Sequence, residues 1–280
     1  MGTFSQTTAR RDQELRVGIG GFGAIGQAVA KRVDEGIPGL SLVAVSARDV
    51  AKAGRNMADF KQPVPVVTLG ELAGLADVVV ECAPAAVFAE VADPAVGAGR
   101  IFVPSSVGCL LSRMDLIDQA EKTGARIVIP TGALIALDTV RAAAEGAIRS
   151  VTMVTRKPPG GLAGAPYLIE NNINIEGLSE ALKVFDGTAR GGAKGFPANL
   201  NVAAALSLAG IGPDETRLQI WADPGVTRNT HTIEVDADSA RFTMTIENIP
   251  SEENPRTGKI TPLSVIAALR GLVSTLKVGT

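Results

Sequence analysis

The chain has 280 residues, and its 27 lysine and arginine residues nearly balance its 29 aspartate and glutamate residues, giving a formal net charge of −2 at pH 7. This balance gives no electrostatic support for binding nucleic acid or an anionic membrane, and an aromatic content of 4% argues against a base-stacking surface. A hydrophobic content of 46% supports a sizeable core, and no apolar run reaches the roughly 18 residues of a membrane span. We therefore expect two domains, with no nucleic-acid partner and no membrane partner.

Two features suggest the compartment and exclude some chemistry. Residues 1–14 are polar, of mixed charge and without an apolar signal core, so we expect a disordered lead-in. The two cysteines, Cys82 and Cys109, are too few and too widely spaced for a disulfide framework or a zinc site. We expect a cytoplasmic protein with no metal site.

A glycine cluster near the start of the chain gives the first functional signal. Residues 15–20 have the pattern of a buried strand, a helical pattern follows, and Gly21, Gly23 and Gly26 fit G-x-G-x-x-G between them. Such glycines allow a tight turn, close approach of a pyrophosphate and close helix packing, while the helix N-terminus attracts phosphate. The strand-then-helix context favours dinucleotide binding over a turn without a ligand. The expected cofactor contacts here are Gly21, Phe22, Gly23, Ala24, Ile25 and Gly26.

The next strand, residues 40–46, bears on the choice of cofactor. An acidic residue about 20 positions past the glycines often binds the ribose 2′-hydroxyl of NAD. Here Ser46 and Arg48 stand at that place, and both side chains are able to bind a 2′-phosphate. Asp49 is close by, so NAD is not excluded. We expect Ser46 and Arg48 to contact NAD or NADP, with a lean to NADP. The alternative is that Arg48 is a solvated loop residue.

Strand and helix patterns alternate through the rest of the first half. The further strands are expected at 64–67, 77–82, 100–104 and 126–130, and the helices at 85–91 and 114–123. This alternation predicts an α/β fold, a Rossmann-type doubly wound parallel sheet, for residues 15–136. Small-residue turns follow three of the strands and meet at the edge where such sheets bind ligands. We therefore expect Cys82 and Ala83, in the first of these turns, to contact the cofactor.

The pattern changes near residue 137, which indicates a second, α+β domain over residues 137–255. We expect a helix at 138–146, a long loop from 157 to 174 and a helix at 196–210. Strands expected at 148–156, 216–222, 230–235 and 242–246 make a four-stranded sheet that is apolar on one face. The C-terminal segment 256–280 contains a helix, 262–276, that is expected to pack back onto the first domain.

Two polar residues lie in apolar patterns of this second domain. Asn201 falls in the helix at 196–210, where it either reaches a ligand or bonds the local backbone. His231, the only histidine, lies on the apolar face of a strand. A histidine in such a place is more often a packed core residue, but its unperturbed pKa also makes it the first candidate for proton transfer.

The chain resembles the L-aspartate dehydrogenase family over nearly its whole length. The matching segments occur in the family's order and are Gly21–Gly26, Ser106–Gly108, Pro130–Ala133 with Leu137 and Asp138, Thr155–Pro159, Phe196–Ala204, Ala222–Pro224, Asn229–His231, Asn248–Pro250 and Asn254–Thr257. The Phe-Pro-x-Asn-x-Asn-Val-Ala-Ala block and the Asn-x-His pair are more specific than the glycines.

The resemblance implies NAD(P)-dependent oxidative deamination of L-aspartate to oxaloacetate and ammonia through iminoaspartate, which in this family also feeds NAD synthesis. It places the catalytic histidine at His231 and further nucleotide contacts at Ala133 and Asn201, and it implies a homodimer formed through the second domain. The cations that bind the substrate carboxylates remain open among Arg156, Lys157, Arg256 and Lys259.

The chain departs from the family pattern in two places. Ile135 and Ala136 stand where the family commonly has two glycines, which should reduce backbone freedom beside the nicotinamide. Three glycines between 190 and 195 should weaken a helix that is usual there.

Two other functions remain as alternatives. One is an imine or carbonyl reductase of the same architecture that acts on another small amino or oxo acid. The other is a non-catalytic NAD(P)-sensing protein.

Overall fold

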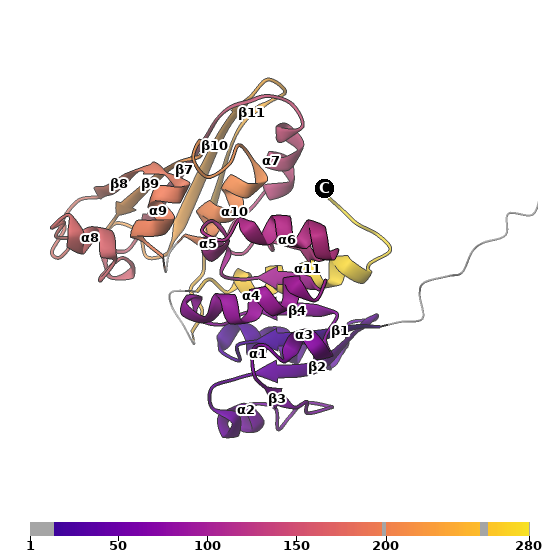
Figure 1. Cartoon of the computed structure of the whole chain (residues 1–280). Helices are drawn as coiled ribbons and strands as arrows, with labels where there is room; N and C mark the ends of the chain where they lie inside the picture. Colours follow the sequence, from indigo (N-terminus) through magenta and orange to yellow (C-terminus); the bar gives the residue numbers. More distant parts are fainter. Residues whose placement is uncertain (1–13, 198–199, 253–256, 280) are drawn as a thin grey trace, which may run out of the picture.

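The computed structural model describes residues 14–197, 200–252 and 257–279, and the lead-in predicted for residues 1–14 lies outside these ranges except for Glu14. Two separate sheets organise the chain. We call the sheet of β1–β6 with its helices and the C-terminal helix the first lobe, and the sheet of β7–β11 with its helices the second lobe. Figure 1 shows the two lobes one above the other.

The first sheet is parallel and has the strand order β3-β2-β1-β4-β5-β6. Its strands are β1 (Leu15–Gly20), β2 (Leu40–Ser46), β3 (Val66–Val67), β4 (Val78–Glu81), β5 (Ile101–Pro104) and β6 (Arg126–Ile127). Every residue of β4 is buried, as expected of a strand covered by helices on both faces. The Rossmann-type sheet predicted from the alternating patterns is confirmed.

Helices cover both faces of this sheet. They are α1 (Ala24–Gly36), α2 (Val50–Asn56), α3 (Leu72–Leu75), the 3-10 turn η1 (Ala85–Val87), α4 (Phe88–Gly97), α5 (Val107–Leu110) and α6 (Asp115–Thr123). One core cluster joins the sheet to α1, and a second joins it to α3, α4 and α6.

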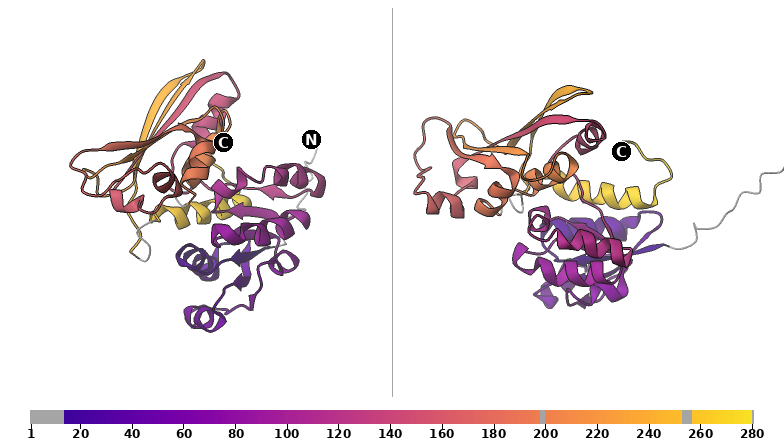
Figure 2. Two further views of the ribbon diagram at one scale, coloured as in Figure 1. Left: turned by 60° about the vertical axis from the view of Figure 1, so that its left-hand side comes forward. Right: turned by 45° about the horizontal axis from the view of Figure 1, so that its top comes forward.

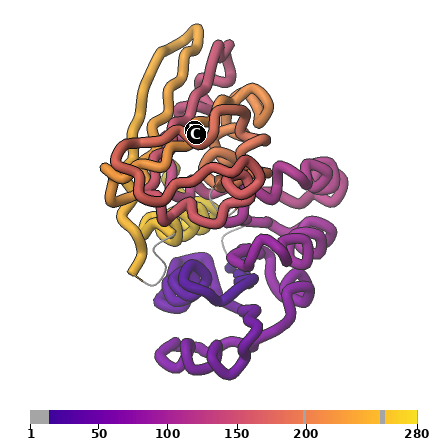
Figure 3. Tube along the Cα trace, turned by 90° about the vertical axis from the view of Figure 1, so that its left-hand side faces the viewer, coloured from indigo at the N-terminus to yellow at the C-terminus, as the bar shows by residue number. Residues whose placement is uncertain are grey.

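The C-terminal helix α11 (Ile260–Val273) returns to the first lobe. Its Val265 and Leu269 are fully buried in the core cluster that contains α1 and β1. Figures 1 and 3 show α11, in yellow, on the side of the first lobe that faces the second lobe. This helix therefore packs onto the first half of the chain.

The second sheet has the order β11-β10-β7-β9-β8, antiparallel except for the parallel pair β7 and β9. Its strands are β7 (Ile148–Lys157), β8 (Leu182–Thr188), β9 (Arg217–Ala222), β10 (Thr230–Ala237) and β11 (Arg241–Glu247). The helices α7 (Leu137–Ala144), α8 (Pro166–Glu170), α9 (Ala189–Gly195) and α10 (Asn201–Ala209) share one core with it. Because α10 also contacts α5, it lies between this sheet and the first lobe (Figures 1 and 2).

The predicted four-stranded sheet is wrong by one strand, because β8 was missed. The register of β8 against β9 shifts between Lys183 and Phe185, so Val184 and Phe185 are both buried although they are adjacent. A bulge of this kind breaks the period-two pattern by which a strand is read from sequence.

Two helix predictions also need correction. The predicted loop at 157–174 contains the 3-10 turn η2 (Pro159–Gly161) and α8. The helix predicted over 196–210 begins only at Asn201; residues 198 and 199 of that prediction lie outside the described ranges. Phe196 instead packs in an aromatic cluster with Tyr167 and Phe185, with ring centroids 5.4 and 5.8 Å away.

The helix α9 forms despite the glycines that were expected to weaken it. Thr188 caps it by accepting the Gly191 N–H at 3.1 Å. A Cβ at Gly192 would collide with Leu218, and one at Gly195 would lie 2.8 Å from Tyr167. Close packing therefore accounts for these two glycines. Over the ranges that the structure describes, no helix is long and apolar enough to cross a membrane.

Candidate active site

The glycine loop between β1 and α1 has the geometry that its spacing predicts. Gly21 adopts φ +100°, and a Cβ there would lie within 2.7 Å of the backbone of Cys82 and Ala83. A Cβ at Gly26 would collide with the carbonyl oxygen of Gly21. At Gly23, the N-cap of α1, a Cβ would meet nothing within 4 Å. The loop is therefore tight against the protein at two glycines and open at the third, beside a helix N-terminus that favours an anion.

The loop lies where the strand order of the first sheet reverses, between β1 and β4. The N–H of Gly21 donates to the carbonyl of Ser46 at 3.1 Å, and the N–H of Cys82 donates to Gly20 at 2.7 Å. Arg48 is exposed beyond the end of β2, whereas the Asp49 carboxylate caps α2 by accepting the Lys52 N–H at 2.8 Å. Open α/β sheets bind their ligands in the crevice at such a reversal.

A buried carboxylate that was not predicted connects two turns at this edge. One oxygen of Glu81, at the end of β4, accepts the Ala83 N–H at 2.9 Å and the Ser106 hydroxyl at 3.1 Å. The other oxygen accepts the Ser106 N–H at 2.9 Å. Burial raises the pKa of Glu81 to about 7, although these hydrogen bonds favour the charged form. The Glu81 side chain thus fixes the turns after β4 and β5 relative to each other.

A cavity of about 140 Å³ lies between the lobes, and we call it the interlobe cavity. Ile25, Ala133, Asn201 and His231 are the predicted site residues that line it. The other lining residues are Ser105, Val107, Pro130, Thr131, Gly132, Lys157, Val202, Ala205, Asn229, Asn248, Thr257, Gly258, Thr261 and Val265. The remaining predicted contacts do not line it but follow the edge of the first sheet: Gly21, Phe22, Gly23, Ala24, Gly26, Ser46, Arg48, Cys82 and Ala83.

His231 enters the interlobe cavity from the start of β10 and is only 3% exposed. Its Nδ1 lies 3.1 Å from the hydroxyl oxygen of the buried Thr155, the residue opposite it on β7. Burial and the nearby charge of Lys157 lower the pKa of His231 to about 3, so the imidazole is neutral near pH 7. Because Thr155 engages Nδ1, Nε2 is the nitrogen left for proton exchange with a ligand.

Of the four candidate cations, Lys157 is the one placed in this cavity among the described residues. It is 5% exposed, and burial lowers the pKa of its ammonium to about 8. Arg156 is turned to the opposite face of the sheet, where it pairs with Asp223 at 2.9 Å and stacks over Trp221. Lys259 pairs with Glu252 at 2.7 Å on the surface. Arg256 lies outside the described ranges.

Two asparagines join the lobes beside the cavity. The Asn201 side-chain oxygen accepts the Gly108 N–H at 3.0 Å, a contact across 93 positions and not the local bond considered from the sequence. Asn248, 4% exposed and not predicted, donates its amide to the carbonyl of Ala133 at 3.0 Å. Asn201 thus holds α5, and Asn248 holds the turn after β6, against the second lobe.

Ala136, one of the two residues that stand where the family commonly has glycine, has a backbone conformation that favours glycine. Ala136 adopts φ +57° at the N-cap of α7, a left-handed conformation that a side chain disfavours. The tight turn is therefore kept, at a conformational cost that the glycine common in the family avoids.

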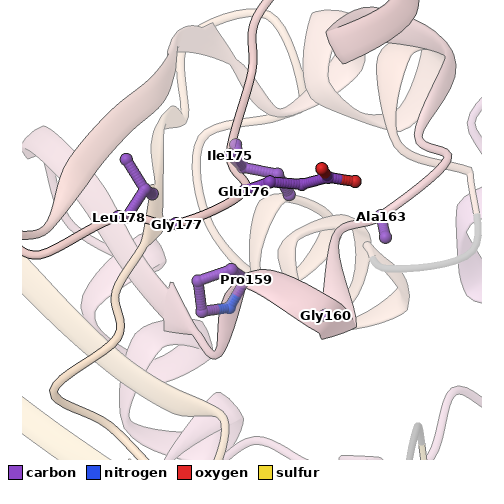
Figure 4. A pocket seen from close by; sticks show the side chains of 7 residues that line it. All are labelled: Pro159, Gly160, Ala163, Ile175, Glu176, Gly177 and Leu178. Atoms are coloured by element: carbon purple, nitrogen blue, oxygen red, sulfur yellow. The ribbon is translucent and has the colours of Figure 1, made fainter.

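A second cavity lies in the second lobe (Figure 4). Its lining consists of Pro159, Gly160, Ala163, Ile175, Glu176, Gly177 and Leu178. It shares no lining residue with the interlobe cavity, and Glu176 is the charged side chain that it offers.

Among the described residues, both lobes line the interlobe cavity: the first lobe contributes residues at the carboxyl edge of its sheet, and the second lobe contributes the buried side chains of His231 and Lys157. This division of labour is typical of NAD(P)-dependent dehydrogenases, and we assign the protein to that class. Two family models match successive parts of the chain. Residues 21–130 match the homoserine dehydrogenase NAD-binding domain, and residues 138–272 match the aspartate dehydrogenase C-terminal domain.

Relatives of full length agree with these matches. The chain is 57% identical over 274 residues to L-aspartate dehydrogenase of Bradyrhizobium diazoefficiens, which covers 98% of this chain and 97% of the relative. It is 55% identical over 269 residues to L-aspartate dehydrogenase 3 of Bordetella bronchiseptica, covering 96% and 98%. The protein belongs to the L-aspartate dehydrogenase family and is an NAD(P)-dependent amino-acid dehydrogenase.

The fold has a counterpart among solved structures. The crystal structure of aspartate dehydrogenase from Thermotoga maritima superposes with a TM-score of 0.72 at 24% identity, covering 95% of this chain and all of that one. At this identity the likeness shows the shared fold.

Proposed function

We propose that the protein catalyses the reversible oxidative deamination of L-aspartate to oxaloacetate and ammonia through iminoaspartate. The observation that carries the proposal is the interlobe cavity, where the neutral imidazole of His231 and the cationic Lys157 are the titratable side chains among the described lining residues. A cavity whose described lining residues offer a cation and no carboxylate suits a dicarboxylate substrate. The names of the similar relatives support the same substrate.

The cofactor lies, in this proposal, along the carboxyl edge of the first sheet. The glycine loop from Gly21 to Gly26 holds the pyrophosphate, because Gly23 leaves open space beside the N-terminus of α1. Ser46 and Arg48 contact the adenosine ribose, and the lean to NADP is supported by Asp49 being engaged in capping α2. The nicotinamide end lies near four residues: Cys82, Ala83, Ala133 and Asn201. When bound, the nicotinamide supplies the acceptor for the hydride from the substrate.

His231 handles the protons of the hydrolytic step. As a water oxygen bonds to the imine carbon, the C=N electron pair moves to nitrogen and the proton leaving the water passes to Nε2. Thr155 holds the ring through Nδ1 at 3.1 Å. Lys157 binds a substrate carboxylate and orients it toward His231.

The assembly and the context of the enzyme are also proposed. Residues 15–136 form the dinucleotide-binding domain, and residues 137–255 form the catalytic and dimerisation domain of a homodimer. Support for the dimer comes from the face of the second sheet opposite its helices, where Arg156 stacks over Trp221 and both side chains are half-buried. We also propose a cytoplasmic enzyme whose iminoaspartate feeds NAD synthesis.

The test is substrate-dependent reduction of the nicotinamide. Purified protein is mixed with L-aspartate and either NAD⁺ or NADP⁺ at alkaline pH, and absorbance of the reduced cofactor is followed, with D-aspartate, L-alanine and His231→Ala as controls. We expect reduction that requires L-aspartate and is lost in the variant, and a higher rate with NADP⁺. Cofactor binding without reduction by L-aspartate would contradict the proposal and favour a reductase of another small acid.

A further inference from the structure

Asn248 holds an unused hydrogen-bond acceptor in the wall of the interlobe cavity. Its side chain is 4% exposed, and its Nδ2 donates to the carbonyl oxygen of Ala133 at 3.0 Å. Its Oδ1 is buried and, among the residues that the structure describes, receives no hydrogen bond. The Ala133 carbonyl can only accept, so it fixes which end of the amide is the oxygen. A buried acceptor without a donor is destabilising, which indicates that a ligand supplies the donor.

The strand register places Asn248 beside His231. The N–H of Asn248 donates to the carbonyl of Asn229 at 2.8 Å, which continues the pairing of β10 with β11 past the end of both strands. His231 pairs with Ile246, and Asn248 follows two residues later, so it shares the cavity face with His231. Diagonal neighbours of this kind lie about 7–8 Å apart, a gap that a small substrate bridges.

Gly258 leaves room next to this oxygen. It also lines the interlobe cavity, and a Cβ there would lie 3.1 Å from Oδ1 of Asn248. Any larger residue at position 258 would therefore press on the oxygen. The neutral amide also suits the proposed substrate, because it accepts an N–H without adding a negative charge that would repel two carboxylates.

We propose that Asn248 determines specificity by accepting, through Oδ1, a hydrogen bond from the nitrogen of the C–N bond that reacts. This inference rests on the proposed function. L-Aspartate and the imine formed from it both carry N–H donors at this nitrogen. As the hydride leaves Cα, the nitrogen lone pair forms the C=N bond and the nitrogen becomes positive. The hydrogen bond to Oδ1 then becomes charge-assisted, so it strengthens as the reaction proceeds.

The same oxygen disfavours a ketone in the reverse direction. Oxaloacetate carries a carbonyl oxygen where the imine carries its N–H, and that oxygen can only accept. Its approach to Oδ1 of Asn248 would place two acceptors together with no hydrogen between them, which a water-excluding site rejects strongly. We therefore expect reduction of the imine to L-aspartate and little direct reduction of oxaloacetate to L-malate.

The binding test compares two dicarboxylates that differ in the nitrogen. L-Aspartate and succinate are titrated by calorimetry into protein saturated with reduced cofactor, which cannot accept a hydride. Asn248→Leu has nearly the same shape as the wild-type side chain but no acceptor. We expect this variant to lose at least about tenfold in affinity for L-aspartate, the size of a hydrogen bond to a charged donor. Affinity for succinate, which has no N–H, should be unchanged.

Two further variants separate a lost acceptor from a damaged fold. Asn248→Asp keeps an acceptor oxygen, so it should keep the preference for L-aspartate over succinate even where both bind more weakly. Asn171→Leu is the matched control and should behave like the wild type. Asn171 is exposed and, like Asn248, donates its amide to a backbone carbonyl, that of Tyr167 at 2.9 Å.

The kinetic test uses oxaloacetate and reduced cofactor with and without an ammonium salt. We expect the wild type to require ammonium, and the ratio of the ammonium-dependent rate to the ammonium-independent rate to fall at least about tenfold in Asn248→Leu. An equal loss of affinity for L-aspartate and succinate overturns the inference. A loss confined to cofactor affinity also overturns it, because Oδ1 would then face the nicotinamide. Both outcomes leave the proposed function standing, which is tested separately by turnover of L-aspartate in the wild type.

Discussion

The two lobes contribute different kinds of chemical groups around the interlobe cavity. The first lobe presents backbone: a glycine loop, a helix N-terminus and turns fixed by N–H groups. The second lobe presents buried side chains whose ionisation its surroundings have changed, His231 and Lys157. In the proposed function, the neutral dipoles of the first lobe hold the anionic cofactor and the buried side chains of the second lobe act on the substrate.

The largest expected effect tests the side-chain half of this comparison. His231→Ala should lower kcat by about 10²- to 10⁴-fold, because it removes the proposed acid–base group. The affinity for the cofactor should stay within about twofold, since backbone groups provide the binding in the first lobe. Steady-state kinetics and quenching of Trp221 fluorescence by the cofactor measure the two quantities. A loss of cofactor affinity as large as the loss of kcat would show that the two halves are not separable.

Glu81 is a buried titratable side chain in the first lobe, where the other contributions come from the backbone. Its ionisation gives the next largest expected effect, which is on the unfolding free energy. Its folded-state pKa of about 7 is above the ordinary carboxyl value of 4.5, so its contribution to stability is fully present below pH 4.5 and is lost as pH rises through 7. Relative to Glu81→Gln, the wild type should lose roughly 3 kcal/mol of unfolding free energy between pH 4.5 and 8, an order-of-magnitude figure.

Urea unfolding of both proteins at several pH values measures this difference. Gln also loses one acceptor for the N–H groups of Ala83 and Ser106, which should cost about 1–3 kcal/mol at every pH. If the two stability curves run parallel across this pH range, Glu81 does not titrate as the structure indicates.

The glycine loop gives a smaller effect that isolates the backbone contribution. Gly23→Ala adds a Cβ that meets no protein atom within 4 Å, so the unfolding free energy should be unchanged. Cofactor affinity should fall about tenfold, or 1.4 kcal/mol, because the methyl group occupies the space proposed for the pyrophosphate. Calorimetric titration with NAD⁺ and NADP⁺ measures the loss.

Gly26→Ala is the matched comparison in the same loop. Its Cβ collides with the Gly21 carbonyl, so this variant should lose stability as well as affinity. An unchanged cofactor affinity in Gly23→Ala would remove the glycine loop from the binding site.

The smallest effect concerns the strained turn before α7. Ala136→Gly should raise the unfolding free energy by up to about 1 kcal/mol, because glycine adopts a positive φ without the cost that alanine has. Ala142→Gly, in the exposed interior of α7, should have the opposite sign and cost about 1 kcal/mol. Thermal unfolding of the two variants side by side distinguishes strain at Ala136 from a general effect of glycine.

The same contrast explains what the sequence was able to predict. The strands and the glycine loop of the first lobe follow from hydrophobic patterns and glycine spacing within short stretches of sequence. The six strands and the loop were therefore predicted where the structure has them. Strand β8 was missed because its bulge places Val184 and Phe185 side by side in the core.

The residues that the second lobe contributes to the cavity could not be identified from the sequence without the fold. Arg156 and Lys157 are adjacent cations in the sequence, but their side chains lie on opposite faces of β7. Arg156 pairs with Asp223 on one face, and Lys157 lines the interlobe cavity on the other. Glu81 lies in no motif, and Thr155 and Asn248 lie in family-matching segments that do not reveal their contacts, since the partners of all three are 25 to 115 positions away. The alternation of strand β7 was the available signal, because Thr155 and Lys157 share a face by period two.

The return of α11 to the first lobe has a consequence for synthesis of the chain. Val265 and Leu269 complete a core whose other members, such as Val17 and Val29, leave the ribosome more than 200 residues earlier. Until α11 emerges from the ribosome, the apolar residues of the first lobe that contact Val265 and Leu269 are uncovered. The second lobe is synthesised during this interval. A fragment ending at residue 136 lacks Val265 and Leu269, so the core cluster shared by β1, α1 and α11 is complete only after α11 has been synthesised.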